Sequence, residues 1–181
     1  MKRTLLSLLI LACLLLSACG ERGAQNRFAA FSEELKARES LAFTADVRAE
    51  YPEWSREFTL RYEKAPEEER VTVLAPALIE GVSATISGTD AALVYDGLIL
   101  DAPPLDPYGL TPMNALSKLT AALTGGSLDS HWEEDGRYVY KLILDDHLAV
   151  TVWFDAGMRP QRAELISDGN VTVFCDITDW S

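Results

Sequence analysis

Apolar and polar residues alternate along most of the sequence, a pattern typical of β-strands with one buried and one wet face. The first long run covers residues 41–51, and the second covers residues 54–63. Short turn sequences separate the runs, among them Asp96-Gly97, Asp135-Gly136 and Asp168-Gly169-Asn170. The pattern predicts about ten strands, joined mostly by short turns into one large, curled antiparallel sheet.

Two segments carry helical spacing instead. Phe28, Phe31 and Leu35 form one apolar stripe on a helix expected from Ala24 to Arg38. A second helix is expected to start at Thr111-Pro112, with threonine as N-cap, and to end at Gly125-Gly126. One side of it carries Met113, Leu116, Leu119, Thr120 and Leu123. The sequence therefore predicts a mainly β (α+β) fold, with one curled sheet covered by an N-terminal and a mid-chain helix.

The N-terminus has the layout of a secretory signal peptide. Lys2 and Arg3 precede an apolar run that ends at Leu16, and small residues follow. The run is about 13 residues long, shorter than the roughly 20 residues that a membrane-spanning helix needs. We therefore expect residues 1–18 to be a removable leader and the protein to be extracytoplasmic.

The end of this leader, Leu16-Ser17-Ala18-Cys19, resembles the lipobox of bacterial lipoproteins. The resemblance implies that Cys19 receives a diacylglycerol thioether and becomes the first residue of the mature chain. Two or more acyl chains, such as palmitate, on one cysteine give a stable membrane anchor. Residues 19–26 would then be a lipidated tether and residues 27–181 the folded domain, held on the extracytoplasmic face of the cell membrane. Secretion without a lipid is the alternative.

Composition and charge narrow the classes of function. The 181 residues include 48 % apolar residues, enough to build the core of one domain and to exclude intrinsic disorder. The chain has 16 Lys and Arg residues against 28 Asp and Glu residues, a net charge of −12. Sequence-independent binding to nucleic acid needs a cationic surface, so this balance argues against a nucleic-acid partner.

The reactive residues give no catalytic or metal-binding pattern. Cys13 lies in the leader and Cys19 would carry lipid, so Cys175 has no partner for a disulfide and is expected to be a buried thiol. The two histidines, His131 and His147, lack zinc-ligand spacing, and no serine lies in a Gly-x-Ser-x-Gly sequence. We expect a protein without a cofactor, a metal or an enzymatic activity.

The order of the predicted elements resembles the LolA/LolB family of lipoprotein carriers. A lipobox precedes an amphipathic helix, a strand meander and a Pro-bounded helix, and the chain ends with Phe174-Cys175-Asp176-Ile177-Thr178-Asp179-Trp180. The resemblance implies an open half-barrel whose concave face is closed by helices and holds acyl chains. Some carriers use an interior arginine to control ligand release. No such residue is assigned here, because the candidate arginines fall on or near polar faces: Arg48, Arg56, Arg61 and Arg162.

A curled sheet of about ten strands has more inner face than two short helices fill with side chains, so an apolar ligand is expected to occupy the remaining space. The candidate lining residues are Phe43, Val47, Trp54, Phe58, Leu60, Tyr62, Leu116, Leu119, Leu123, Val152 and Phe154. The alternative is that these side chains only pack against one another.

A second function class stays open beside lipid binding. Trp153 is expected to point to the face opposite Val152 and Phe154, and Trp180 lies near the C-terminus. Exposed aromatic residues are common interface anchors, whereas burial under a loop or helix would give them a structural role. The alternative function is therefore a non-catalytic protein-interaction or envelope-sensor module with a protein partner in the cell envelope.

Overall fold

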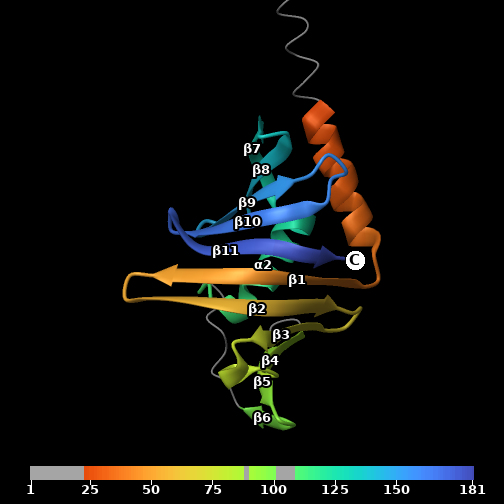
Figure 1. Cartoon of the computed structure of the whole chain (residues 1–181). Helices are drawn as coiled ribbons and strands as arrows, with labels where there is room; N and C mark the ends of the chain where they lie inside the picture. The colour runs from red at the N-terminus through yellow and green to blue at the C-terminus, as the bar shows by residue number, and fades with distance from the viewer. Residues whose placement is uncertain (1–22, 88–89, 101–108) are drawn as a thin grey trace, which may run out of the picture.

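The computed structural model describes residues 23–87, 90–100 and 109–181. Eleven antiparallel strands form one sheet in the order β6-β5-β4-β3-β2-β1-β11-β10-β9-β8-β7 (Figure 1). The strands are β1 (Leu41–Tyr51), β2 (Trp54–Lys64), β3 (Glu69–Ala75), β4 (Ser83–Ser87), β5 (Asp90–Tyr95), β6 (Leu98–Leu100), β7 (Ser127–Glu134), β8 (Arg137–Ile143), β9 (Leu148–Phe154), β10 (Pro160–Ser167) and β11 (Asn170–Trp180). A short 3-10 helix, η1 (Ala77–Ile79), joins β3 to β4.

The sheet consists of two meanders that meet at its centre. Strands β1 to β6 follow one another outward to one edge, and strands β11 to β7 do the same toward the other edge. The first and last strands join the halves, with Val47 opposite Cys175 and Ala49 opposite Val173. Residues far apart in the sequence therefore form the middle of the sheet, and β6 and β7 are its two free edges (Figure 1).

Alternation along each strand decides which face is buried. In β1 the side chains of Phe43, Ala45 and Val47 are buried, and those of Asp46 and Arg48 on the opposite face are exposed. The predicted two-residue period is thus confirmed. The turns also follow the sequence, since Asp96 and Gly97 have φ angles of 50° and 75° and Asp135 and Gly136 have φ angles of 50° and 74°. Two successive left-handed residues give the turn that matches strand twist.

The N-terminal helix (residues 23–37) covers the concave face near β8, β9 and β11. Phe28 packs against Tyr140 with ring centroids 5.0 Å apart, and Phe31 packs against Phe154 at 5.0 Å. The hydroxyl of Tyr140 donates a hydrogen bond of 3.0 Å to the carbonyl oxygen of Ala24. The helix is already formed at residue 23, the first described residue, and its aromatic stripe faces the sheet as predicted.

The second helix, α2 (Pro112–Gly125), begins and ends where the sequence predicts. The backbone N–H of Thr111 donates a 2.8 Å hydrogen bond to the side-chain oxygen of Asn114, which closes the first turn. At the other end, a Cβ added to Gly126 would lie 2.6 Å from the carbonyl oxygen of Ala122, so only glycine fits there. The chain then continues directly into β7.

Helix α2 lies inside the curl of the sheet, where it contacts strands β1 to β4 and strands β8 to β10 (Figure 1). Its 14 residues make a helix about 21 Å long. Strands β4 to β8 are seven spacings apart, about 34 Å along the sheet. A helix of this length contacts both groups of strands because the sheet curls around it, as a half-barrel does.

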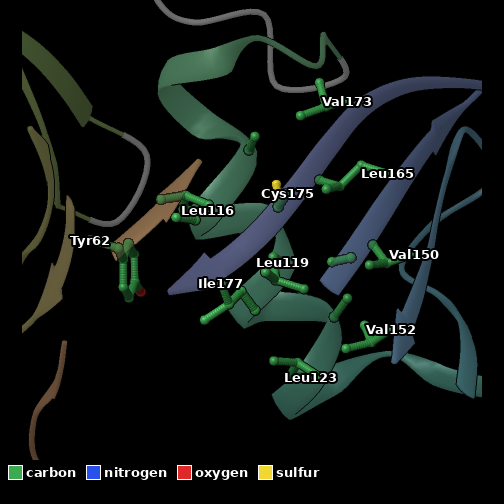
Figure 2. Packing of buried hydrophobic residues seen from close by; sticks show 14 of the residues in the cluster. Tyr62, Leu116, Leu119, Leu123, Val150, Val152, Leu165, Val173, Cys175 and Ile177 are labelled. Atoms are coloured by element: carbon green, nitrogen blue, oxygen red, sulfur yellow. The ribbon is translucent and has the colours of Figure 1, made fainter. Parts of the chain in front are cut away.

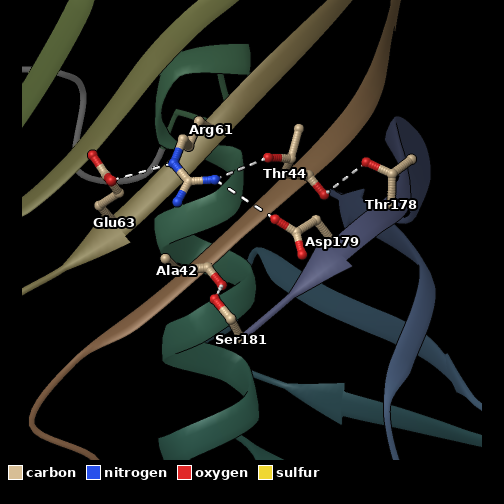
Figure 3. Close-up of polar contacts among 7 residues, drawn as sticks. All are labelled: Ala42, Thr44, Arg61, Glu63, Thr178, Asp179 and Ser181. Atoms are coloured by element: carbon tan, nitrogen blue, oxygen red, sulfur yellow. Dashed lines mark hydrogen bonds and ion pairs between the residues drawn. The ribbon is translucent and has the colours of Figure 1, made fainter.

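The outer face of the central strands is polar. Arg61 on β2 forms ion pairs with Glu63 at 3.2 Å and with Asp179 on β11 at 3.7 Å, and it donates a 3.4 Å hydrogen bond to Thr44 on β1 (Figure 3). Ser181 and Ala42 exchange backbone hydrogen bonds beside this group. Exposed contacts of this kind are worth about 0–1 kcal/mol each, so burial on the concave face provides most of the stability.

The eleven strands agree with the sheet of about ten strands expected from the sequence. Strand β8 ends at Ile143, because Asp145 accepts hydrogen bonds of 2.9 Å from the backbone N–H groups of His147 and Leu148 and so forms a turn. Within the residues that the structure describes, no helix combines the length and the apolar character that crossing a bilayer requires.

The buried face of α2 predicts the effect of truncation. Replacing the fully buried Leu119 with alanine should lower the free energy of unfolding by about 2–5 kcal/mol, because the side chain leaves a cavity in the core. Leu78→Ala is the matched control, since Leu78 is 89 % exposed and its loss should change the free energy of unfolding by less than about 0.5 kcal/mol. Urea titrations followed by circular dichroism measure both. Equal losses would contradict the assignment of the core to this face.

Candidate ligand-binding face

The concave face carries a row of apolar residues that runs from the centre of the sheet to the β6 edge. Phe43 on β1 is paired with Tyr62 on β2, which is paired with Val71 on β3. The row continues through Ala84 on β4 to Leu93 on β5. Because paired residues of antiparallel strands share a face, the whole row lies on the side that α2 covers at the centre.

Nine of the eleven residues predicted to line a cavity are fully buried or nearly so. They are Phe43, Val47, Leu60, Tyr62, Leu116, Leu119, Leu123, Val152 and Phe154. All nine belong to one apolar cluster between the sheet and α2 (Figure 2). The structure therefore brings these predicted residues together, and α2 packs directly against them in the central part of the face.

The other two predicted residues lie toward the rim. Phe58 is half-buried and pairs with Val47, so it shares the concave face. Trp54 is 40 % exposed and stacks on Tyr51 with ring centroids 4.4 Å apart. Between them, Arg56 pairs with the buried Ala49. Arg56 therefore shares the concave side, but it lies exposed at the rim and not in the interior.

The apolar face extends beyond the helices. On β5 and β6, Tyr95 is 45 % exposed and its strand partner Leu98 is 66 % exposed. Both lie on the concave side, because Tyr95 is two residues from Leu93 on the same strand. Ile86 and Leu93 beside them are half-buried. We call Ile86, Leu93, Tyr95 and Leu98 the exposed apolar sector.

Sequence reasoning identified the strands of this sector but assigned none of these four residues to a site. The alternation of residues 91, 93 and 95 showed that one side of the strand is apolar. It held no information on how far along the sheet the covering helices reach.

A polar contact marks the border between the covered and the exposed parts. The hydroxyl of Ser117 on α2 donates a hydrogen bond to the carboxylate of the half-buried Glu69 on β3. Tyr62 lies beside Glu69 and Thr120, and its buried hydroxyl has no hydrogen bond of normal geometry to either. Burial, and next the charge of Glu69, raise the pKa of Tyr62. The hydroxyl of Tyr62 therefore stays protonated and can donate a hydrogen bond at this border.

Surface hollows also lie away from the concave face. One, of about 690 Å³, lies on the outer face over the central strands, and its charged walls include Asp46, Arg48, Arg162 and Asp176. Another, of about 570 Å³, lies where Tyr51 and Leu110 meet the β10–β11 turn, and its walls mix apolar and polar residues. The charged walls of the first hollow suit a polar group better than a hydrophobic ligand.

The tryptophans predicted as interface anchors are partly buried. Trp180 packs on Phe43 with ring centroids 4.9 Å apart. Trp153 points to the outer face as expected, and its indole N–H donates a 3.0 Å hydrogen bond to Glu134. Trp132, which sequence reasoning did not single out, donates to the same carboxylate at 3.4 Å and is 40 % exposed. The hydrogen bond from Trp153 and then that from Trp132 lower the pKa of Glu134.

The two histidines have separate surroundings. His131 lies 6.1 Å from the ring of Tyr140, whereas His147 is hydrogen-bonded to Asp168 at 2.8 Å in an exposed turn. This hydrogen bond and the charge of Asp168 raise the pKa of His147. Among the residues described, no three His, Cys, Asp or Glu side chains are grouped as metal ligands.

No protein-family model and no curated protein matches the sequence. Solved structures do match. An uncharacterised conserved protein from Thermus thermophilus is 14 % identical with a TM-score of 0.50, over 87 % of this chain and 86 % of that one. A LolA superfamily protein from Nitrosomonas europaea is 16 % identical with a TM-score of 0.48, over 87 % of this chain and 92 % of that one. The lipoprotein LppX from Mycobacterium tuberculosis is 14 % identical with a TM-score of 0.42, over 85 % and 93 %.

At these identities the similarity concerns the fold. The single open antiparallel sheet, curled around a helix and covered by a second one, is an open half-barrel. The fold class predicted from the sequence is thereby confirmed.

Cys175 reports on the packing of this face. It lies among Leu116, Leu119 and Leu165 in Figure 2, and burial raises the pKa of its thiol to about 12. The thiolate is the reactive form, so a disulfide reagent at pH 8 should leave Cys175 unmodified in the folded domain. In guanidinium chloride the same residue should react completely. Fast reaction of the native protein would show that the concave face is open to solvent at its centre.

Proposed function

We propose that this protein is a membrane-anchored, extracytoplasmic lipoprotein whose concave face binds a lipid or another hydrophobic ligand. The observation that carries the proposal is the exposed apolar sector. It belongs to the same face as the fully buried core, yet Tyr95 and Leu98 are 45 % and 66 % exposed. Continuous apolar surface of this kind on a folded domain is typical of ligand grooves and interaction sites.

The shape of the sector favours a chain-like ligand. Leu93 continues the row that begins under α2 at Phe43 and Tyr62, so an acyl chain placed on Leu93 and Tyr95 lies in line with the core. To reach the candidate residues deeper inside, such as Leu116 and Leu119, the chain has to replace part of the packing of α2. The contact between Ser117 and Glu69 would be broken by that movement.

The location follows from the N-terminal residues. The proposed anchor is a thioether-linked diacylglycerol on Cys19, four residues before residue 23, where the described part of the N-terminal helix starts. Two acyl chains on one cysteine hold a protein stably at a bilayer, whereas one chain binds only marginally. This part of the proposal rests on the lipobox-like sequence.

Lipidation is tested with a fatty-acid analogue that can be coupled to a dye. The wild type expressed in a bacterium should take up the label, and Cys19→Ala should not, because the substitution removes the only sulfur that can form the thioether at this position. Cys13→Ala, a substitution within the same leader, should still be labelled. Equal labelling of the wild type and Cys19→Ala would reject the anchor.

Ligand binding is tested on the domain without its leader and Cys19, using a fluorescent fatty acid. Leu98→Asp should weaken binding about tenfold or more, because a carboxylate on the concave side of β6 would have to be desolvated by the chain. Ile99→Asp is the matched control. Ile99 is 72 % exposed on the adjacent position of the same strand, and its side chain points to the outer face.

Titrations followed by fluorescence give the two affinities, and native mass spectrometry of the wild type identifies any ligand that co-purifies. Absence of saturable binding by the wild type would overturn the proposed function. Equal loss in both variants would move the ligand away from the concave face.

A second candidate function, an interaction or sensor module, is favoured by one observation. Leu98 and Ile99 are adjacent on the free edge strand β6, point to opposite faces of the sheet, and are 66 % and 72 % exposed. Apolar side chains on both sides of a free edge strand suit a protein partner. A partner whose binding is lost with Ile99→Asp, while fatty-acid binding persists, would support this alternative.

A further inference from the structure

We infer that the β7 edge of the sheet faces the bilayer that anchors the protein, so that the exposed apolar sector at the β6 edge points away from it. The surface involved is the first turn of the N-terminal helix together with β7 and the β7–β8 turn, and its partner is a layer of lipid headgroups. The inference rests on the proposed anchor at Cys19.

The segment between the proposed anchor and the N-terminal helix is short. Only three residues lie between Cys19 and residue 23, the first described residue, which already belongs to the helix. A fully extended chain covers at most about 3.6 Å per residue, so residue 23 stays within about 14 Å of the anchored cysteine. A domain held this closely cannot turn freely, and the side on which the helix begins must face the membrane.

The N-terminal helix starts near the β7 edge of the sheet. Near its start, Arg27 donates a 2.9 Å hydrogen bond to Tyr138 on β8. Further along, Phe31 packs against Trp180 on β11 at 6.5 Å. The helix therefore runs across the strands from β8 toward the centre of the sheet, and its first turn lies at the β7 end (Figure 1).

The two edges of the sheet are far apart. Ten strand spacings separate β7 from β6. At about 4.8 Å each they amount to roughly 48 Å along the sheet. Curling shortens the direct distance, but Figure 1 shows β6 and β7 at opposite ends of the molecule. The exposed apolar sector is thus far from the point of attachment.

The chemistry of the β7 edge suits a headgroup layer. Trp132 is 40 % exposed there, and tryptophan side chains prefer the level of lipid headgroups. Exposed carboxylates at this edge outnumber the cations, with Asp129, Glu133, Glu134 and Asp135 as anions and Arg27 and Arg137 as cations. An anionic lipid surface would repel such an edge, so the headgroup layer that fits it is zwitterionic.

The arrangement bears on where the ligand comes from. An exposed apolar sector that points away from the anchoring bilayer does not exchange its ligand directly with that bilayer. The ligand has to come from a donor, or pass to an acceptor, on the far side of the domain.

Energy transfer from a single dye to labelled headgroups tests this orientation. The full chain is expressed with its leader, and the lipidated protein is reconstituted into phosphatidylcholine vesicles that contain an acceptor dye on a small fraction of headgroups. Dyes are placed on Glu133→Cys in β7, Glu57→Cys in β2 and Ile99→Cys in β6, three exposed positions. Cys175 is fully buried, so the introduced thiols take the dye.

Transfer should fall in the order Glu133, Glu57, Ile99, and the first should exceed the last about twofold or more, given the width of the sheet. Transfer that is equal at all three positions, or strongest from Ile99, would overturn the orientation while leaving the anchor intact. Failure of the protein to float with the vesicles would instead reject the anchor, and the orientation with it. Fatty-acid binding by the soluble domain is measured separately and depends on neither result.

Discussion

The structure depends on one requirement, which is to keep the apolar face of a single open sheet away from water. A second sheet would meet this requirement in a sandwich, and full closure would meet it in a barrel. Here the chain uses helices. Because β6 and β7 are the two edges of the sheet, the chain has to pass from one edge to the other, and α2, which lies between them in the sequence, makes part of this passage over the concave face. Its apolar residues then cover the centre of the face as it crosses.

The covering is incomplete for a reason of length. The N-terminal helix and α2 have 15 and 14 residues, about 22 Å and 21 Å of helix, against a sheet about 48 Å wide. The N-terminal helix packs over strands on the β8 to β11 side, and α2 occupies the centre. The apolar face at β5 and β6 therefore lies outside the reach of both helices. The exposed apolar sector results directly from this difference between the length of the helices and the width of the sheet.

Local signals in the sequence were sufficient for the elements and for the sides of the strands. The alternation around Phe43 and Val47, the Thr111-Pro112 helix start and the Asp-Gly turns all depend on neighbouring residues, and the structure agrees with each. Long-range features were not accessible in this way. No local pattern shows that Val47 pairs with Cys175. The position of the exposed apolar sector depends on strand order, which the sequence does not encode locally.

The pairing of β1 with β11 also has a consequence for when the protein folds. Phe43 and Trp180 are opposite each other although 136 residues separate them in the sequence. A pairing between such distant residues forms late, because a long loop must close before the contact contributes. The central strand β1 lacks one of its two neighbours until β11 has been synthesised. For the extracytoplasmic lipoprotein proposed above, this delay would suit passage through a narrow translocation channel, since the N-terminal half cannot complete its sheet before the C-terminal half has followed it.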